Sequence, residues 1–274
     1  MFAHEFMRNA LIAGTFIGAA CGLVGYPLVL RAQVFAGDAL GHVAFAGALA
    51  AAAIGIDIRV GLFAATIVVA LAMGGLGERA QADDVTIGTV FAWVLGLGVL
   101  FLAIFTTSQS AGNGTAAVRV LFGSIFGLSG SDTMLAAVIA LAAVAGTLAI
   151  ARPLLFASID PDVASAHGVP VRLVGLVFLA VLGVVGAEAT QAVGALLLLG
   201  LVAAPAAAAH RVTRSPYAGL ALSAGFAVSV VWAGLALAYL VPSVPPSTAI
   251  IGLATVLYAT AAVSAPFVFS PTRG

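Results

Sequence analysis

The sequence predicts an all-α polytopic membrane protein with eight or nine transmembrane helices. Of its 274 residues, 63% are hydrophobic and only 7% are charged, whereas about a quarter of the residues in an ordinary soluble domain are charged. Almost the whole chain divides into apolar runs close to the roughly 20 residues that cross a bilayer. The ten acidic residues are balanced by ten basic ones, and lysine is absent, so the chain offers no polybasic surface for nucleic acid.

The apolar runs predict the spans in chain order. Four spans are expected at residues 10–30, 39–54, 60–76 and 85–105, with a solvated charged loop at 77–84. Residues 116–128 are apolar but too short to cross, which predicts a re-entrant or interfacial helix. Five more runs follow at 133–151, 173–187, 191–208, 217–240 and 248–269. The total is nine if both runs around Glu188 cross and eight if one is a half helix, within a single domain of residues 1–274.

A short polar helix is predicted between two of these spans, in residues 152–172. Asp160 is its expected N-cap and Pro161 its first helical residue, while Gly168 and Pro170 end it. A short polar helix between two membrane spans has no core of its own to join. We therefore expect it to bind a partner protein.

The arginines predict the orientation in the membrane. If residues 152–172 face the cytoplasm, alternation through nine spans places seven arginines inside and three outside, as the positive-inside rule requires. The N-terminus is then outside and the C-terminus inside. The inner set is Arg31, Arg79, Arg152, Arg172, Arg211, Arg214 and Arg273, and the outer set is Arg8, Arg59 and Arg119.

An acid and a histidine lie four residues apart in the segment 31–47. On a helix this spacing places Asp38 and His42 on one face, where both can contact one ligand. Carboxylate and imidazole together suit Zn²⁺, Mn²⁺ and Fe²⁺, and ionisable residues in membrane helices are functional by default. The alternative is structural: Asp38 caps the second span and His42 is an interfacial histidine. Pro27 also allows the first span to end early, with residues 29–41 as irregular backbone along the path.

Glu188 is the third candidate ligand. It lies between two apolar runs with no arginine nearby in the sequence to neutralise it. The alternative is a turn residue at the outer surface, because the runs on either side are short. His167 is expected at the surface of the short helix, and His210 at a cytoplasmic helix end, so neither is a good ligand candidate.

Motifs that are absent from the sequence exclude or disfavour several classes of function. A G-x-x-x-x-G-K-[ST] nucleotide loop cannot occur without lysine, so an ATP-driven process needs a separate ATPase. No H-E-x-x-H is present, which disfavours an intramembrane zinc protease of that type. The single cysteine, Cys21, excludes a disulfide framework within the chain. A stand-alone secondary transporter or channel is the alternative, but no convincing internal repeat with paired broken helices is found.

Five sequence blocks, taken in order, carry a family resemblance. They are residues 25–31 with GDALGH at 37–42 and Gly47; DVTIG at 84–88 with Gly96 and Gly98; LFG at 121–123; DPDVA at 160–164 with HGVPVR at 167–172; and VGALL at 193–197 leading to APA at 204–206 and Arg211. This order resembles the permease subunit of metal-ion (zinc, manganese, iron) ABC transporters, which are related to cobalamin and siderophore importers. Gly41 departs from the pattern, since serine is common at that position.

The resemblance implies a type II ABC importer-like permease in the bacterial cytoplasmic membrane. Its partners would be a second copy of the chain, two ABC ATPase subunits and an extracytoplasmic metal-binding protein. The permease is expected not to be an enzyme and to hold no permanent cofactor; zinc or manganese, or else iron, would be transported.

The resemblance also implies roles for particular residues. Asp38 and His42 align with the family's intramembrane acid and histidine on the translocation path, and Glu188 falls where a further polar residue can occur. The short helix, at about residues 158–169, is similar to the family's coupling helix, which sits in a cleft of the ATPase. The expected ATPase-coupling residues are Asp160, Pro161, Asp162, Ala164 and Gly168.

Overall fold

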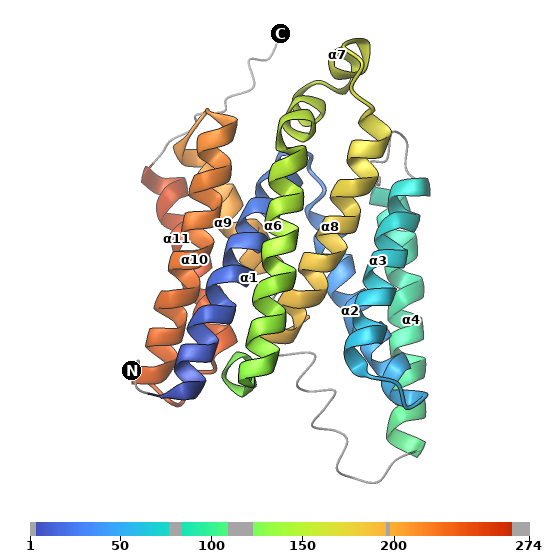
Figure 1. The fold of residues 1–274 in the computed structure, drawn as a ribbon, viewed down its shortest axis with the longest axis vertical. Helices are drawn as coiled ribbons and strands as arrows, with labels where there is room; N and C mark the ends of the chain where they lie inside the picture. Colours follow the sequence, from blue (N-terminus) through green and yellow to red (C-terminus); the bar gives the residue numbers. More distant parts are fainter. Residues whose placement is uncertain (1–3, 77–83, 109–122, 196–197, 265–274) are drawn as a thin grey trace.

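Long helices run along the longest axis of the molecule in alternating directions (Figure 1). The computed structural model describes residues 4–76, 84–108, 123–195 and 198–264, and these residues form helices and no strand. Eight helices are long and apolar enough to cross a membrane, and α9 is a shorter apolar helix, which agrees with the predicted eight spans plus a half helix. The helices are α1 (Glu5–Leu30), α2 (Val34–Ala53), α3 (Ile58–Leu76), α4 (Asp84–Ser108), α6 (Gly130–Ile159), α7 (Pro161–Ala166), α8 (Val171–Ala192), α9 (Leu198–Val212), α10 (Pro216–Leu240) and α11 (Pro246–Ser264), with a 3-10 turn, η2 (Ile125–Gly127), before α6.

Two sequence predictions fall largely outside the described residues. The charged loop at 77–84 is described only at its last residue, where α4 begins. The helix predicted at 116–128 is described from residue 123 onward, where the short turn η2 lies. Arg79, Arg119 and Arg273 are outside the described part of the chain as well.

The connection between α1 and α2 is a tight turn. Pro27 lies inside α1 and does not end it, so the prediction of an early end followed by irregular backbone is wrong. Ala32 adopts a left-handed conformation with φ of 54°, and the Gln33 N–H donates to the carbonyl of Leu28 at 3.0 Å. Because α2 already begins at Val34, it starts earlier than the apolar run suggested.

The helices around residues 129–192 begin and end at residues with clear capping chemistry. Ser129 and Asp132 form a capping box at the start of α6. Asp160 caps α7, its Oδ1 accepting from the N–H groups of Asp162 (3.1 Å) and Val163 (2.9 Å). Gly168 follows α7 with φ of 81°, a conformation that glycine adopts without steric cost. The predicted start and stop of the short helix are thus confirmed.

The bundle has two distinct ends (Figure 1). At one end, called the α7 end, α7 projects beyond the long helices, α1 finishes and α8 and α10 begin. At the other end, called the N-terminal end, α1, α3 and α6 begin. Arg31, Arg172 and Arg214 therefore lie at or next to helix termini of the α7 end, and Arg8 and Arg59 at the N-terminal end, grouped as the sequence predicted.

Helix α8 lies between two groups of helices. On one side α2, α3 and α4 pack together, with α2 against both α3 and α4. On the other side α1 packs against α6, α9 and α10, and α11 packs against α9 and α10. Since α8 contacts α2 and α3 as well as α1 and α6, it is the main connection between the α2–α4 unit (Val34–Ser108) and the remaining helices.

Candidate functional site

Asp38 and His42 lie one turn apart on α2 and are both half-buried. His42 meets Phe91 of α4 edge-on, with the ring centroids 5.1 Å apart and the planes at 69°. Asp38 opens into a cavity of about 350 Å³ between α2 and α4, which is also lined by Phe35, Ala39, Ile87, Gly88 and Phe91. The acid and the imidazole therefore both face α4 across a space that is otherwise apolar.

The position of Asp38 decides between the two interpretations of this residue as a ligand or a cap. Gln33, not Asp38, occupies the N-cap position of α2. Asp38 is the fifth residue of the helix, beyond the first turn, where a side chain no longer satisfies the free backbone N–H groups. The capping interpretation is wrong, and the carboxylate has no such structural role in α2.

Helix α4 supplies a wall of the site that the sequence did not predict. Ile87 and Phe91 reach the cavity from α4, and a Cβ added to Gly88 would meet nothing within 4 Å. Gly88 belongs to the DVTIG block at residues 84–88, which is part of the family resemblance. Nothing else in the sequence indicated that this block lies next to Asp38, so the resemblance was the available sign that α4 forms part of the site.

One copy of the chain brings together few ligands for a cation. Within the described residues, no group of three or more His, Cys, Asp and Glu side chains could hold a metal ion. Asp38 and His42 leave further coordination positions to water or to groups from another molecule. Such an incomplete ligand set releases a cation more easily than a closed cage does, which suits transient binding.

Glu188 is not brought together with Asp38 and His42. It lies inside α8, which is continuous from Val171 to Ala192, so the interpretation as a surface turn is wrong. The residue is only 5% exposed, and among the described residues it does not form, with Asp38 and His42, a group of three that could hold a metal ion. Contact between Glu188 and a transported cation stays a prediction.

The short helix α7 presents a mixed surface beyond the membrane helices. Ala164 is fully buried in a small cluster with Ala157 of α6 and Val171 of α8, so it fixes α7 to the bundle and does not face outward. Asp162 is exposed. A groove of about 660 Å³ runs beside the helix and is lined by Pro161, Asp162, Ser165, Val169, Pro170, Val171, Arg172, Leu173 and Leu176. This groove offers charged and apolar contacts to a partner.

The two histidines that the sequence set aside are engaged elsewhere. His167 is exposed, and its Nδ1 lies 2.8 Å from the carbonyl oxygen of Val163. His210 is in the last turn of α9, stacked on Tyr26 with centroids 4.0 Å apart, and its Nε2 lies 3.1 Å from the Tyr26 carbonyl oxygen. Because a carbonyl oxygen only accepts, this Nε2 is the donor. The surface position of His167 and the helix-end position of His210 agree with the sequence prediction, while the cytoplasmic side expected for His210 stays a prediction.

Arg31 and Gln33 form an unexpected buried polar pair in the α1–α2 turn. Their exposed fractions are 9% and 3%, and neither the guanidinium nitrogens nor the amide atoms have a hydrogen-bond partner in the described part of the chain. The Arg31 guanidinium lies 5.5 Å from the ring centroid of Phe178. Burial lowers the pKa of Arg31 to about 10, so the side chain stays protonated at neutral pH.

Comparison with known proteins identifies the family. A profile of the ABC 3 transport family matches residues 3–265. Over 275 residues, covering 100% of this chain and 90% of the relative, the chain is 28% identical to the manganese transport system membrane protein MntC of Halalkalibacterium halodurans. It is also 28% identical over 215 residues, 78% of this chain and 70% of the relative, to the chelated iron transport system membrane protein YfeD of Yersinia pestis.

A solved structure has the same arrangement of helices. PsaBC from Streptococcus pneumoniae, in complex with Fab, matches with a TM-score of 0.82 and 25% sequence identity, over 96% of this chain and 93% of that one. The family profile covers nearly the whole chain, and the similarity in fold extends over the same length. The chain therefore belongs to the ABC 3 transport family, as a multi-pass membrane permease subunit that is not itself an enzyme.

Proposed function

We propose that this permease imports a divalent transition-metal ion, with manganese as the first candidate and zinc and ferrous iron as the others. The observation that carries the proposal is the placement of Asp38 and His42, one turn apart in a membrane helix, with Asp38 lining a cavity whose wall includes Phe91 and His42 in contact with that same ring. Manganese and iron transport are named for the relatives MntC and YfeD. Carboxylate and imidazole accept all three metals, so the ligands alone do not choose among them.

A second copy of the chain completes the proposed path. Two ligands from each copy would replace part of the water shell of a cation held between them. The half-buried state of Asp38 and His42 is compatible with this arrangement, because part of each side chain stays accessible to a cation and to a second copy. Weak, partly hydrated coordination allows the ion to leave toward the cytoplasm after it has arrived from outside.

The α7 end is the proposed cytoplasmic side, with the N-terminus outside and the C-terminus inside. This orientation gives the arginines the distribution that the positive-inside rule expects. Two ATPase subunits would dock on α7 and its groove, and an extracytoplasmic metal-binding protein would deliver the ion at the N-terminal end. Membership of an ABC family leaves the alternative of a stand-alone secondary transporter without support.

Metal uptake by cells that depend on this permease tests the proposal. Asp38→Ala and His42→Ala are each expected to lower manganese uptake by more than about tenfold, because ligand loss affects metal handling at least as strongly as loss of a residue that supports a ligand. Ser229→Ala and Thr255→Val are controls at exposed positions within α10 and α11, and they should leave uptake unchanged. Normal uptake by both site variants would refute the assignment, provided that the variants assemble with the ATPase as the parent does.

Glu188 needs a separate arm in the same assay. If Glu188 contacts the ion, Glu188→Gln lowers uptake by more than about tenfold, whereas uptake stays within about twofold of the parent if Asp38 and His42 alone bind it. Asp38→Asn is the matched comparison, because it makes the same change of carboxylate to amide. Equal losses in the two variants would make Glu188 a metal contact.

A further inference from the structure

Two helix N-termini meet around one guanidinium at the N-terminal end of the bundle. Arg59, in the first turn of α3, forms an ion pair with Asp132 of α6, its Nη2 donating to Oδ1. The other carboxylate oxygen of Asp132 accepts from the Ser129 N–H at 3.3 Å, within the capping box of α6. Asp57 in turn accepts from the backbone N–H of Arg59 at 2.8 Å. Both partners of the ion pair are thus held in place by local capping bonds.

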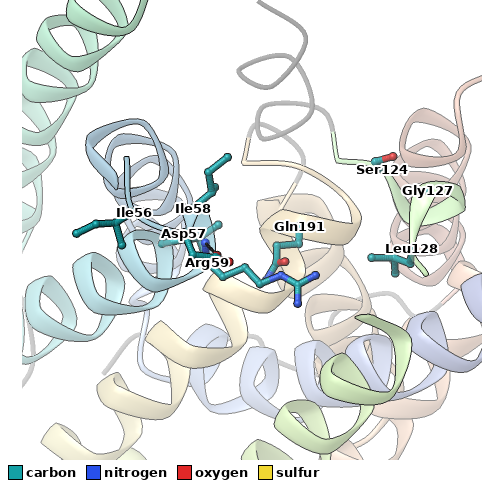
Figure 2. Close-up of a pocket in the computed structure, with 9 residues that line it drawn as sticks. Ile56, Asp57, Ile58, Arg59, Ser124, Gly127, Leu128 and Gln191 are labelled. Atoms are coloured by element: carbon teal, nitrogen blue, oxygen red, sulfur yellow. Dashed lines mark hydrogen bonds between the residues drawn. The ribbon is translucent and has the colours of Figure 1, made fainter. Parts of the chain in front are cut away.

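The ion pair lies beside a cavity of about 500 Å³. Figure 2 shows the Arg59 side chain extending from α3 past Gln191. One wall consists of Ile56, Asp57, Ile58, Arg59 and Leu62, and the other of Ser124, Gly127, Leu128 and Gln191. The second wall is tied to the rest of the bundle, because the Ser124 N–H donates to the Gln191 carbonyl at 3.1 Å and Asn9 Nδ2 donates to the Leu128 carbonyl at 3.4 Å.

The ion pair connects two groups of helices that otherwise meet mainly through α8. Helix α3 packs on α2 and α8, while α6 packs on α1 and α8. At the α3–α8 contact a Cβ on Gly183 would lie 3.0 Å from the Thr66 carbonyl oxygen and 3.2 Å from the Ala70 Cβ. The groups that meet at Gly183 are backbone and a methyl group, whereas nearer the α7 end Leu176 and Leu179 of α8 pack against Gly74 of α3. Because no long side chain interlocks at Gly183, the contact suits a small rotation of the α2–α4 unit on α8 about the Gly74 contact.

We infer that the Arg59–Asp132 ion pair is a latch that opens and closes during transport. When closed, it ties the α2–α4 unit, which carries Asp38 and His42, to α6. When open, it lets this unit move on α8 and widens the cavity at the N-terminal end. The inference rests on the proposed function, since it describes a step in the import of the metal ion.

The strength of the pair suits a bond that breaks in every cycle. The side chains of Arg59 and Asp132 are 34% and 29% exposed, so water and salt compete for both groups. A bond of this kind biases an equilibrium between two arrangements without locking either one. The capping bonds to Ser129 and Asp57 keep the partners positioned while the ion pair is open, so that it can form again.

Reversible cross-linking tests whether the latch must open. Arg59→Cys and Asp132→Cys are combined in a Cys21→Ala parent, and the thiols are joined with a bifunctional methanethiosulfonate. We expect cross-linking to lower manganese uptake by at least about tenfold, since a closed outer end blocks a gated path, and dithiothreitol to restore it. The monofunctional reagent, which modifies both thiols without joining them, should leave uptake within about twofold of that of the unmodified double-cysteine protein.

The outcomes separate the latch from the proposed function. Full uptake by the cross-linked protein would overturn the latch alone, and so would equal losses with the monofunctional reagent. An unmutated protein that transports neither manganese, zinc nor iron would overturn the proposed function and the latch together.

Charge exchange gives a second test that a purely structural bond would not satisfy. Arg59→Asp places two acids opposite each other and should hold the latch open, so that vesicles preloaded with manganese lose the ion several-fold faster than the parent does. The exchanged pair, Arg59→Asp with Asp132→Arg, should bring efflux back toward the parent rate. Unchanged efflux in Arg59→Asp, or no recovery in the folded exchanged pair, would count against the latch.

Discussion

Gly47 and Gly61 oppose each other where α2 crosses α3, so closely that a Cβ built on Gly61 would lie 2.3 Å from the carbonyl oxygen of Gly47. A Cβ on Gly47 would in turn lie 2.5 Å from the carbonyl oxygen of Gly61. Small residues let membrane helices approach until their backbones touch. Because Asp38 and His42 are on the same helix as Gly47, this crossing helps to set where the pair faces α4.

Replacing Gly61 tests how much of the fold depends on that crossing. Gly61→Ala is expected to destabilise the protein by about 1–3 kcal/mol, because the added methyl group overpacks a contact between two backbones. Gly75→Ala is the matched control on the same helix, where a Cβ would meet nothing within 4 Å and better helix propensity is expected to leave stability equal or higher. Thermal unfolding of both variants in detergent measures the difference; equal midpoints would contradict the close approach.

Replacing Arg31 is expected to change stability in the opposite direction from replacing Gly61. The Arg31 guanidinium is buried, lacks a hydrogen-bond partner among the described residues and lies over the Phe178 ring, a contact weaker than the cost of desolvating the charge. Arg31→Met is therefore expected to leave the free energy of unfolding unchanged or to raise it by about 1–3 kcal/mol. The exposed Arg214→Met should stay within about 0.5 kcal/mol of the parent. Strong destabilisation by Arg31→Met would mean that the charge is paired in the purified protein.

Substitutions of Asp160 can separate its role as the N-cap of α7 from the effect of its negative charge. Asp160→Ala removes both and should weaken the short helix by about 1 kcal/mol, whereas asparagine caps nearly as well as aspartate. We expect Asp160→Ala to lose the co-purifying ATPase and to speed hydrogen exchange at the amides of Asp162 and Val163. Asp160→Asn should keep both close to the parent. If the asparagine variant loses the ATPase as fully as the alanine variant, the charge matters and the cap does not.

Much of the fold follows from hydropathy, but the continuity of α8 does not. The polar stretch from Glu188 to Thr190 lowers the local hydropathy and suggested a break between two runs. It contains no proline or glycine, and glutamate and alanine are good helix formers, so the backbone continues through it to Ala192. Hydropathy reports which residues prefer lipid, whereas a helix ends where the backbone geometry requires it.

Only the part of the site that lies within a single helix was predicted from the sequence. Asp38 and His42 came from spacing within α2, but the opposing wall from α4 depends on tertiary packing. Arg59 and Asp132, separated by 73 residues, are likewise brought together only by the packing of α3, α8 and α6. The place of each residue near a helix start was readable in part, since Arg59 and Asp132 directly precede the predicted runs at 60–76 and 133–151. The bond between them carried no sequence signal.

Asp160 is both the C-cap of α6 and the N-cap of α7, so the two helices share a residue and have no flexible linker between them. A push on α7 has little slack in which to be absorbed, and it acts on a helix of 30 residues that contains Pro153 near its α7 end and extends for about 45 Å. The far end of this helix carries Ser129 and Asp132. An ATPase that moves α7 would therefore also move the N-terminal end of α6, on the opposite side of the membrane.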